Sequence, residues 1–282
     1  MRILVATLAV LSACGPGGRN GDDGPADPDA GIVESDATTQ PTDNSRVYGH
    51  SGTALYRLNP LTLSAVSIGA MTGLEGQLLD LAVDKNDKLV GSTATKFYSL
   101  DANTGKPTLL ADFSGSAGGL TSLSYVPSNI SDPASPEVLV TANGDGDVFR
   151  IDVSGNSATA TKIGNYGKRG ADQIKSSGDL FGVRGFGIYA TVDIGSGSND
   201  WLAKIDPATW KATPLPNDTG YDKIFGLGFW GGRIYGFVDD GFEAGTGKII
   251  QIDPVTGKGT LLVSGAERWF GAGVTTDAPT IF

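Results

Sequence analysis

The chain has 282 residues, of which 39% are hydrophobic and 42 are glycine, and its formal net charge is −10. A single Cys excludes a disulfide within the chain, and a single His leaves little scope for metal or nucleophile chemistry, so we expect no metal and no cofactor. The acidic balance argues against nucleic acid as a partner. No run of 18 apolar residues is present, so no helix is expected to span a bilayer.

The first residues have the features of a secretion signal. Arg2 precedes a short apolar run, Ile3–Leu11, and small residues follow. The motif LSAC, Leu11–Cys14, resembles the lipobox of bacterial lipoproteins. This resemblance implies that residues 1–13 are removed and that Cys14 carries acyl chains, which anchor the protein in a membrane. Gly15 after the cysteine favours the outer membrane over the inner one, and the alternative is an ordinary signal with a cysteine by chance.

Residues 14–45 are expected to comprise the lipidated Cys14 and an acidic tether. Residues 15–45 contain seven acids, one Arg and almost no large apolar side chains. Such a composition cannot bury enough surface to offset the entropy of ordering, so we predict a disordered spacer. The folded part is then expected over residues 46–282, in the cell envelope. A periplasmic and a surface-exposed location are both compatible with the sequence.

A phrase near the C-terminus, KIIQIDPVTGKGTLL, has four imperfect copies upstream. In each copy an alternating strand ends at Asp or Asn, whose side chain can bond backbone amides of a tight turn, and a second strand follows. Gly257 suits the left-handed position of this turn. Leu63 and Trp210 stand at that position in two other copies, so we expect those two turns to differ. The turn-forming residues are Asn59, Asp101, Asp152, Asp206 and Asp253.

Two further strands precede each hairpin, which gives units of four strands at a period of 42 to 54 residues. This period is typical of propeller blades. The last unit ends at the strand that the first unit lacks, residues 271–274, so this strand is expected to complete the N-terminal blade. Residues 46–282 therefore resemble an all-β, five-bladed β-propeller with circular closure, and a β-sandwich or a solenoid would not produce this pattern.

The loops before the innermost strands are expected to surround one mouth of a central channel. Aligned, these loops carry cations at equivalent positions, namely Lys168, Lys223 and Arg268. The flanking acids and aromatic residues are Asp222, Glu267, Tyr166, Tyr221 and Trp269. Such a mouth could bind a glycan or an anionic ligand through charged and stacking contacts. The alternative is a set of solvated charges that pair with neighbouring acids.

Two carboxylates are candidates for the channel itself. Asp172, with Gln173, is assigned to an innermost strand where other units have apolar residues, and Asp80 begins another. Glycosidases need such a pair at a defined separation, and five-bladed furanosidases resemble this architecture, although none of their blade signatures is present. The alternative is an Asp172 that bonds backbone amides. His50 is expected on a second strand, as a core or surface residue.

The sequence therefore favours a lipid-anchored, monomeric, non-enzymatic propeller that binds a ligand or partner in the envelope. A hydrolase, either a glycoside hydrolase or a lactonase with Asp80 and Asp172 as its acids, is the alternative. The separation and burial of the two carboxylates distinguish these hypotheses, because carboxylates buried against backbone donors favour a structural role.

Overall fold

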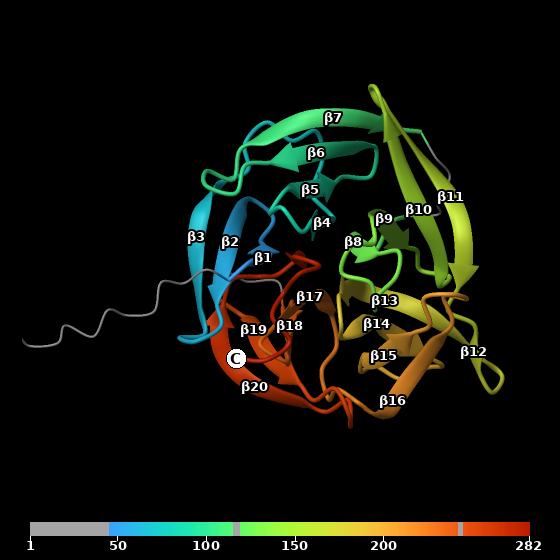
Figure 1. The fold of residues 1–282 in the computed structure, drawn as a ribbon. Coiled ribbons are helices and arrows are strands. Elements are labelled where there is room, and N and C mark those ends of the chain that lie inside the picture. The colour runs from blue at the N-terminus through green and yellow to red at the C-terminus, as the bar shows by residue number, and fades with distance from the viewer. Residues whose placement is uncertain (1–44, 115–118, 242–244) are drawn as a thin grey trace, which may run out of the picture. The chain divides into compact units, whose positions relative to one another are not determined.

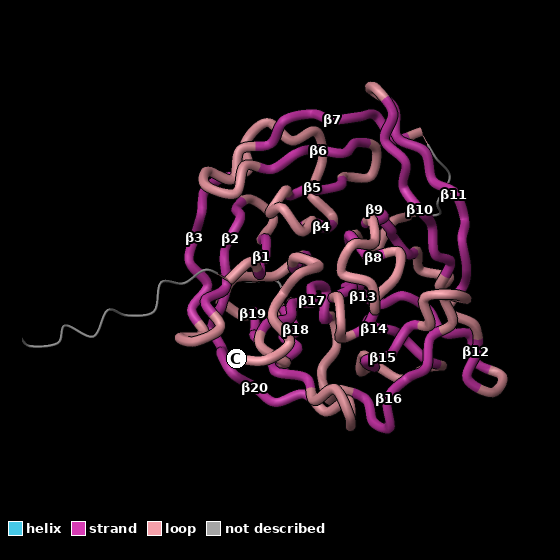
Figure 2. The backbone as a smooth tube through the Cα atoms, viewed as in Figure 1, coloured by secondary structure: helices cyan, strands magenta, loops and turns pink. Residues whose placement is uncertain are grey.

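A computed structural model describes residues 45–114, 119–241 and 245–282, which belong to a unit spanning residues 43–282. The expected signal sequence, Cys14 and nearly all of the tether lie outside the described residues. The described residues form β-strands and no helices, and Figure 2 shows only strands and loops there. No helix long and apolar enough to cross a membrane occurs among these residues.

The first sheet joins the two ends of this unit. Its strand order is β21 (Gly271–Val274), β1 (Val47–His50), β2 (Ala54–Asn59) and β3 (Ser64–Ala70). β1 pairs antiparallel with β21 from Val47 opposite Val274 to His50 opposite Gly271. The strand expected to complete the N-terminal sheet therefore does pair there.

A sheet of eight strands follows. It consists of two antiparallel meanders whose outer strands, β7 and β11, pair in parallel at Ser157 opposite Asp112 and Ala158 opposite Phe113. This short pairing joins what the sequence predicts as two separate blades, so the described residues form four hydrogen-bonded sheets rather than five. The strands of the eight-stranded sheet are β4 (Asp80–Val83), β5 (Leu89–Ser92), β6 (Lys96–Leu100), β7 (Pro107–Phe113), β11 (Ser157–Asn165), β10 (Asp147–Ser154), β9 (Glu137–Ala142) and β8 (Ser124–Pro127).

The remaining two sheets are meanders. One has the order β12 (Lys168–Arg169), β13 (Asp172–Val183), β14 (Gly187–Ile194), β15 (Trp201–Ile205) and β16 (Ala212–Asp218). The other has the order β17 (Ile224–Trp230), β18 (Arg233–Val238), β19 (Gly247–Ile252) and β20 (Gly259–Ala266). β13 is longer than the sequence predicts, and its register shifts between Ser176 and Leu180.

The sheets are arranged around a common centre (Figure 1). Their inner strands contact one another in a cycle that runs β4, β8, β13, β17, β21 and back to β4. Small residues permit this approach: a Cβ on Gly226 would lie 2.6 Å from the Cβ of Ala272, and one on Gly273 would lie 2.6 Å from the Leu81 carbonyl oxygen. The small residues at the axis therefore have a steric cause.

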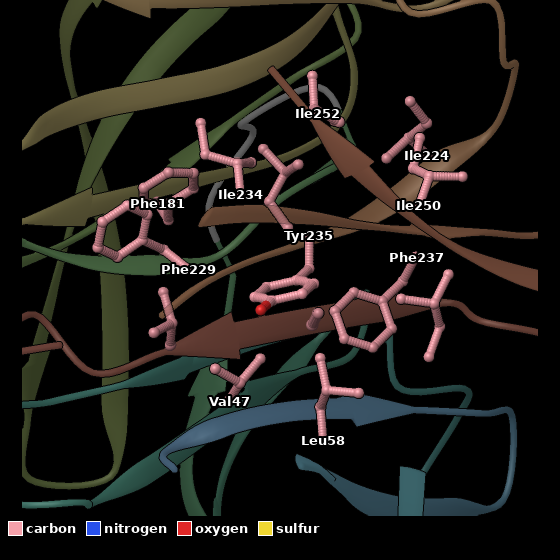
Figure 3. Packing of buried hydrophobic residues seen from close by; sticks show 14 of the residues in the cluster. Val47, Leu58, Phe181, Ile224, Phe229, Ile234, Tyr235, Phe237, Ile250 and Ile252 are labelled. Carbon is pink, nitrogen blue, oxygen red and sulfur yellow. The ribbon is translucent and has the colours of Figure 1, made fainter. Parts of the chain in front are cut away.

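Large apolar side chains fill the space between adjacent sheets. Figure 3 shows one cluster, in which Phe229, Tyr235 and Phe237 of the β17–β20 sheet lie near Val47 of the first sheet and Phe181 of β13. All five side chains are almost completely buried. Burial of a side chain of this kind contributes about 1.5–3 kcal/mol, so sheet-to-sheet packing is a main source of stability.

The repeated hairpin turns follow the expected chemistry. Asp253 Oδ1 accepts hydrogen bonds from the Val255 and Thr256 amides at 2.9 and 2.7 Å. Leu63 and Trp210 both have φ of 59°, and both bond back to the turn Asn or Asp as Gly257 does. The expectation that their turns differ is wrong. Packing keeps Trp210 in this strained conformation, because it is buried over Gly164, which leaves room for the indole.

The C-terminal residues cross the ends of the inner strands. Thr275 bridges to Val83 at the end of β4, the Arg184 amide after β13 donates to the Thr276 carbonyl, and the Gly231 amide after β17 donates to the Pro279 carbonyl. Arg184 also forms an ion pair with Asp277 at 2.7 Å. The segment thus covers one end of the axis, and the opposite end is where the inner strands begin.

Candidate functional site

A cavity of about 200 Å³ lies where the inner strands begin. Each inner strand contributes one residue that lies within the strand or at most three residues before it, so all of the sheets build the cavity together. These residues are Leu79, Thr121, Gly178, Phe225 and Phe270. The remaining lining residues are Gln77, Leu78, Leu120 and Ser177. The cavity is therefore mainly apolar, with two aromatic rings and a hydroxyl-bearing flank.

A pair of buried carboxyl groups lies one residue further along two of these strands. Asp80 begins β4 and is 1% exposed, and Asp179 of β13 is 0% exposed. The two side chains interact through a hydrogen bond, which requires that they share a proton. The structure therefore places an acidic pair at the axis directly after the cavity-lining residues Leu79 and Gly178.

Both carboxyl groups bond backbone amides in the same way. Each accepts from the next residue of its own strand: Leu81 N to Asp80 Oδ1 is 2.8 Å, and Leu180 N to Asp179 Oδ1 is 2.6 Å. Each also accepts from a neighbouring sheet, since Leu123 N lies 2.7 Å from Asp80 Oδ2 and Leu227 N lies 2.6 Å from Asp179 Oδ2. The pair thus ties together strands of different sheets.

Burial is the main cause that raises the pKa of both carboxyl groups well above the ordinary range of Asp. The charge of Asp179 raises the pKa of Asp80 further, whereas the amide hydrogen bonds act in the opposite direction. Two carboxylates in contact cannot both ionise easily, so the pair titrates as one unit that retains a proton.

His50 lies beside this pair. It is fully buried at the end of β1, opposite Gly271. A Cβ on Gly271 would lie 2.5 Å from His50 Nε2 and 2.4 Å from Asp80 Oδ1, so the ring and the carboxyl group are neighbours. Nδ1 donates to the Ser51 carbonyl at 3.0 Å, which makes Nε2 the acceptor of a neutral ring. Burial lowers the pKa of His50 to about 4.

Three nearly fully buried side chains near the pair have a polar atom without a hydrogen-bond partner among the described residues. They are His50 through Nε2, Ser92 through its hydroxyl and Tyr166 through its hydroxyl. Ser92 lies opposite Asp80 in the β4–β5 register, so their side chains share one face. Tyr166 lies close enough to Asp179 for that charge to raise its pKa, after burial as the larger cause.

A further buried carboxyl group lies behind the polar flank of the cavity. Asp200 accepts a hydrogen bond from the Ile224 amide at 2.7 Å and lies beside Ser177. Burial, with the charges of Asp193 and Asp222 as smaller causes, raises the pKa of Asp200 to about 7. This side of the cavity is therefore backed by three acids.

Asp172, expected beside Asp80, lies elsewhere. It is exposed at the start of β13, where it pairs with Arg169 of β12 in the strand register, and Gln173 is only partly buried. The axial part of β13 begins at Asp179, because residues 172–176 belong to an outer extension of the strand. The carboxyl partner of Asp80 is therefore Asp179, and the assignment of Asp172 to the channel is wrong.

The three expected cations have different surroundings, and none of them lines the cavity. Arg268 forms a two-pronged ion pair with Asp239, with both N–O distances at 2.8 Å, and its guanidinium lies 5.1 Å from the ring centre of cavity-lining Phe270. Lys223 is exposed, with φ of 58°. Lys168 is exposed in β12, which lies at the outer margin of the ring in Figure 1.

The residues that flank the three cations are buried, partly buried or exposed. Trp269 and Tyr166 are buried, and Trp269 packs edge-on against Tyr56 and Phe237, so neither offers the expected stacking surface. Tyr221 is partly buried against the core and packs over Gly259. Asp222 and Glu267 are exposed, as the rim hypothesis requires. The aromatic lining instead comes from Phe225, the second residue of β17, and Phe270, the residue before β21.

Sequence reasoning missed Asp179 and the apolar cavity lining, and it placed His50 on a second strand without its position beside Asp80. A signal for Asp179 was present, because the dipeptide Asp-Leu occurs at Asp80 and again at Asp179, and both copies bond their own Leu amide. Within residues 45–114, 119–241 and 245–282, no group of three or more His, Cys, Asp or Glu side chains is placed to hold a metal ion.

Comparisons with known proteins yield only distant likenesses. No family model matches the chain, and no curated protein matches it. Similar solved structures include a PQQ-bound aldose sugar dehydrogenase from Streptomyces coelicolor, with 18% identity, a TM-score of 0.43 and coverage of 66% of this chain and 62% of that chain. This chain thus spans less than two thirds of the dehydrogenase.

Two further solved structures illustrate the range. A periplasmic gluconolactonase from Pseudomonas aeruginosa has 11% identity and a TM-score of 0.40, with coverage of 77% of this chain and 78% of that chain. The Dos1 propeller has 15% identity and a TM-score of 0.39, with coverage of 77% and 55%. The structural neighbours thus include propeller proteins, and the described residues share their all-β composition of several sheets.

Proposed function

We propose that residues 46–282 form a five-bladed β-propeller with circular closure. The eight-stranded sheet then counts as two blades, because only the short parallel pairing of β7 with β11 joins them. The cycle of contacts among the inner strands and the pairing of β21 with β1 support this count. Under this proposal each blade begins at the cavity.

We further propose that the propeller is a lipid-anchored protein of the cell envelope, with the outer membrane favoured over the inner one. The support is the sequence LSAC at Leu11–Cys14, followed by the acidic residues 15–45. Replacement of Cys14 by Ser should abolish labelling by a fatty-acid probe and move the protein to the soluble fraction. Continued fractionation of this variant with membranes would contradict the anchor.

The proposed activity is non-enzymatic binding of a small ligand in the cavity at the start of the inner strands. The observation that carries it is the lining itself: a residue in or just before each of the five inner strands contributes, and two of these five residues are phenylalanine. An apolar cavity with a few convergent polar groups is the usual form of a small-molecule site. Under this proposal the ring of sheets is a rigid support for one binding site.

The buried acids favour binding over hydrolysis. Both oxygens of Asp80 and both of Asp179 accept backbone amides, and neither residue lines the cavity. A general acid or base must come within hydrogen-bonding reach of the substrate. Hydrolysis remains the alternative function, and turnover of chromogenic glycosides or lactones that is lost in Asp179→Asn but kept in Asp172→Asn would establish it.

The binding proposal is tested by screening a fragment library against the purified domain with ligand-observed NMR. Phe225→Ala removes a cavity wall that is only partly buried, and should weaken the hits. Phe282→Ala removes the same side chain from an exposed position beside Gly231, at the opposite end of β17, and serves as the matched control. Absence of hits, or equal effects of the two substitutions, would contradict a ligand site in this cavity.

A further inference from the structure

The lining of the cavity has an aromatic side and a polar side. Phe225 and Phe270 come from β17 and β21, which are neighbours in the cycle of inner strands. The polar side chains belong to the other three members of the cycle, since Gln77 precedes β4, Thr121 precedes β8 and Ser177 lies in β13. Leucines before β4 and β8 add apolar surface. A ligand therefore meets two rings on one side and polar side chains on the other.

The polar side chains differ in the hydrogen bonding that they offer to a ligand. The Thr121 hydroxyl donates to the Ala142 carbonyl at 3.1 Å, so its proton is already engaged. The Ser177 hydroxyl is buried beside Asp200. Gln77 is exposed, and its carboxamide can both donate and accept. The lining thus serves one hydrogen-bonding group of a ligand, at Gln77.

This polar inventory is too small for a sugar. A sugar brings several hydroxyl groups, and each hydroxyl that enters the cavity loses its contact with water. Hydroxyl groups out of reach of Gln77 would face phenylalanine and leucine side chains and stay without a partner, which is costly. An apolar ring with a single polar substituent avoids this cost.

The lining also disfavours a charged ligand. Among the described residues that line the cavity, none carries a charged side chain. Both oxygens of Asp80 and of Asp179 already accept backbone amides, and neither residue reaches the lining. The guanidinium of Arg268 lies 5.1 Å from the ring centre of Phe270 and is held by Asp239, so a second cation at that ring would meet a like charge. An ion of either sign would lose its hydration without gaining a counter-charge.

We infer that the cavity binds an uncharged ring compound with a single hydrogen-bonding substituent. The ring contacts Phe225 and Phe270, and the substituent bonds the carboxamide of Gln77. At about 200 Å³ the cavity has room for one such ring. This inference rests on the proposed function, because it names the ligand class of the same cavity, and it replaces the anion or glycan that the loop cations suggested.

The experiment is a ligand-observed NMR titration of the purified protein at pH 7 with toluene, benzyl alcohol, benzylamine, benzoate and glucose. Toluene and benzyl alcohol should bind. Benzylamine and benzoate, which are charged at this pH, should bind at least about tenfold more weakly than benzyl alcohol, and glucose should not bind. An ion or glucose that binds as tightly as benzyl alcohol would overturn this inference and leave the cavity as a ligand site. Binding of none of the five would overturn the inference and the proposed function together.

Two matched substitutions locate the polar substituent. Gln77→Ala should lower the ratio of the affinity for benzyl alcohol to that for toluene by about threefold or more, the effect of one lost hydrogen bond. Gln251→Ala changes a partly exposed glutamine of β19 that does not line the cavity, and should keep the ratio. An unchanged ratio in Gln77→Ala, or an equal fall in both variants, would contradict the position given to the substituent.

Discussion

Replacement of Asp179 by Asn is expected to destabilise the domain at pH 5, and the structure gives the size of the effect. Both oxygens of Asp179 accept buried amides, from Leu180 and Leu227. Asn keeps a single acceptor oxygen, so one of these two amides loses its partner. An unsatisfied buried amide costs about 1–3 kcal/mol. For a domain of this size each kcal/mol lowers the Tm by about 2–4 °C.

The effect should depend on pH with a definite sign. The pKa of Asp179 is raised in the folded protein, so the folded state holds its proton more tightly than the unfolded state. Stability from this group is complete below the unfolded pKa and is lost as pH rises through the folded pKa. The unmodified protein should therefore lose stability toward alkaline pH, and the deficit of the Asn variant should be smaller at pH 9 than at pH 5.

Urea unfolding followed by tryptophan fluorescence measures both quantities, because Trp269 is buried among aromatic residues in the core. Asp172→Asn is the control, since its carboxylate is exposed and its replacement should change the midpoint little. Asp179→Asn with unchanged stability at pH 5 would refute the role given to the amide hydrogen bonds. A deficit that grows with pH would refute the shared proton.

Two further outcomes are expected. Asp200→Asn should gain stability relative to the unmodified protein as pH rises from 4 to 7. The reason is that the pKa of Asp200 is raised from 3.8 to about 7, so the stability that its proton contributes is lost across that window. Urea midpoints at both ends of the window measure this, and a constant difference between the two proteins would contradict it. Gly257→Ala should lower the free energy of unfolding by more than about 1 kcal/mol in a thermal melt, since φ is 84° and a Cβ would lie 2.5 Å from the Asn217 carbonyl oxygen. Gly155→Ala should cost less, because Gly155 has φ of 58° and open space around its Cβ position. Equal costs for the two variants would show that the clash at Gly257 is relieved.

The strand order and the hairpins were predictable because their signals are local. An Asp or Asn side chain that bonds amides two and three residues later acts within one turn, and it appears in the sequence at each repeat. The pairing of residues 271–274 with β1 was also predictable, since the first unit lacks an inner strand before β1 and the last unit ends at one.

The candidate site was predicted less well, and β13 shows why. Its outer part, residues 172–176, alternates like an inner strand, and the hairpin with β12 is an addition to the repeat. Aligning that addition with the other units shifted Asp172 into the place of Asp179. The burial of Tyr166 and Trp269 depends on packing between sheets, which no local pattern in the sequence describes.

The pairing of β1 with β21 has a consequence for how the chain folds. Val47 and Val274 are partners although they lie almost the whole domain apart in sequence, so β1 keeps an open edge until the last strand arrives. An open edge strand can pair with another chain, and it is most vulnerable in a chain that is shortened or still emerging. Loss of the final strand would therefore leave a protein whose other sheets can form but which is prone to self-association and proteolysis. The pairing of β21 with β1 is thus the step at which the chain becomes resistant to self-association and to proteolysis.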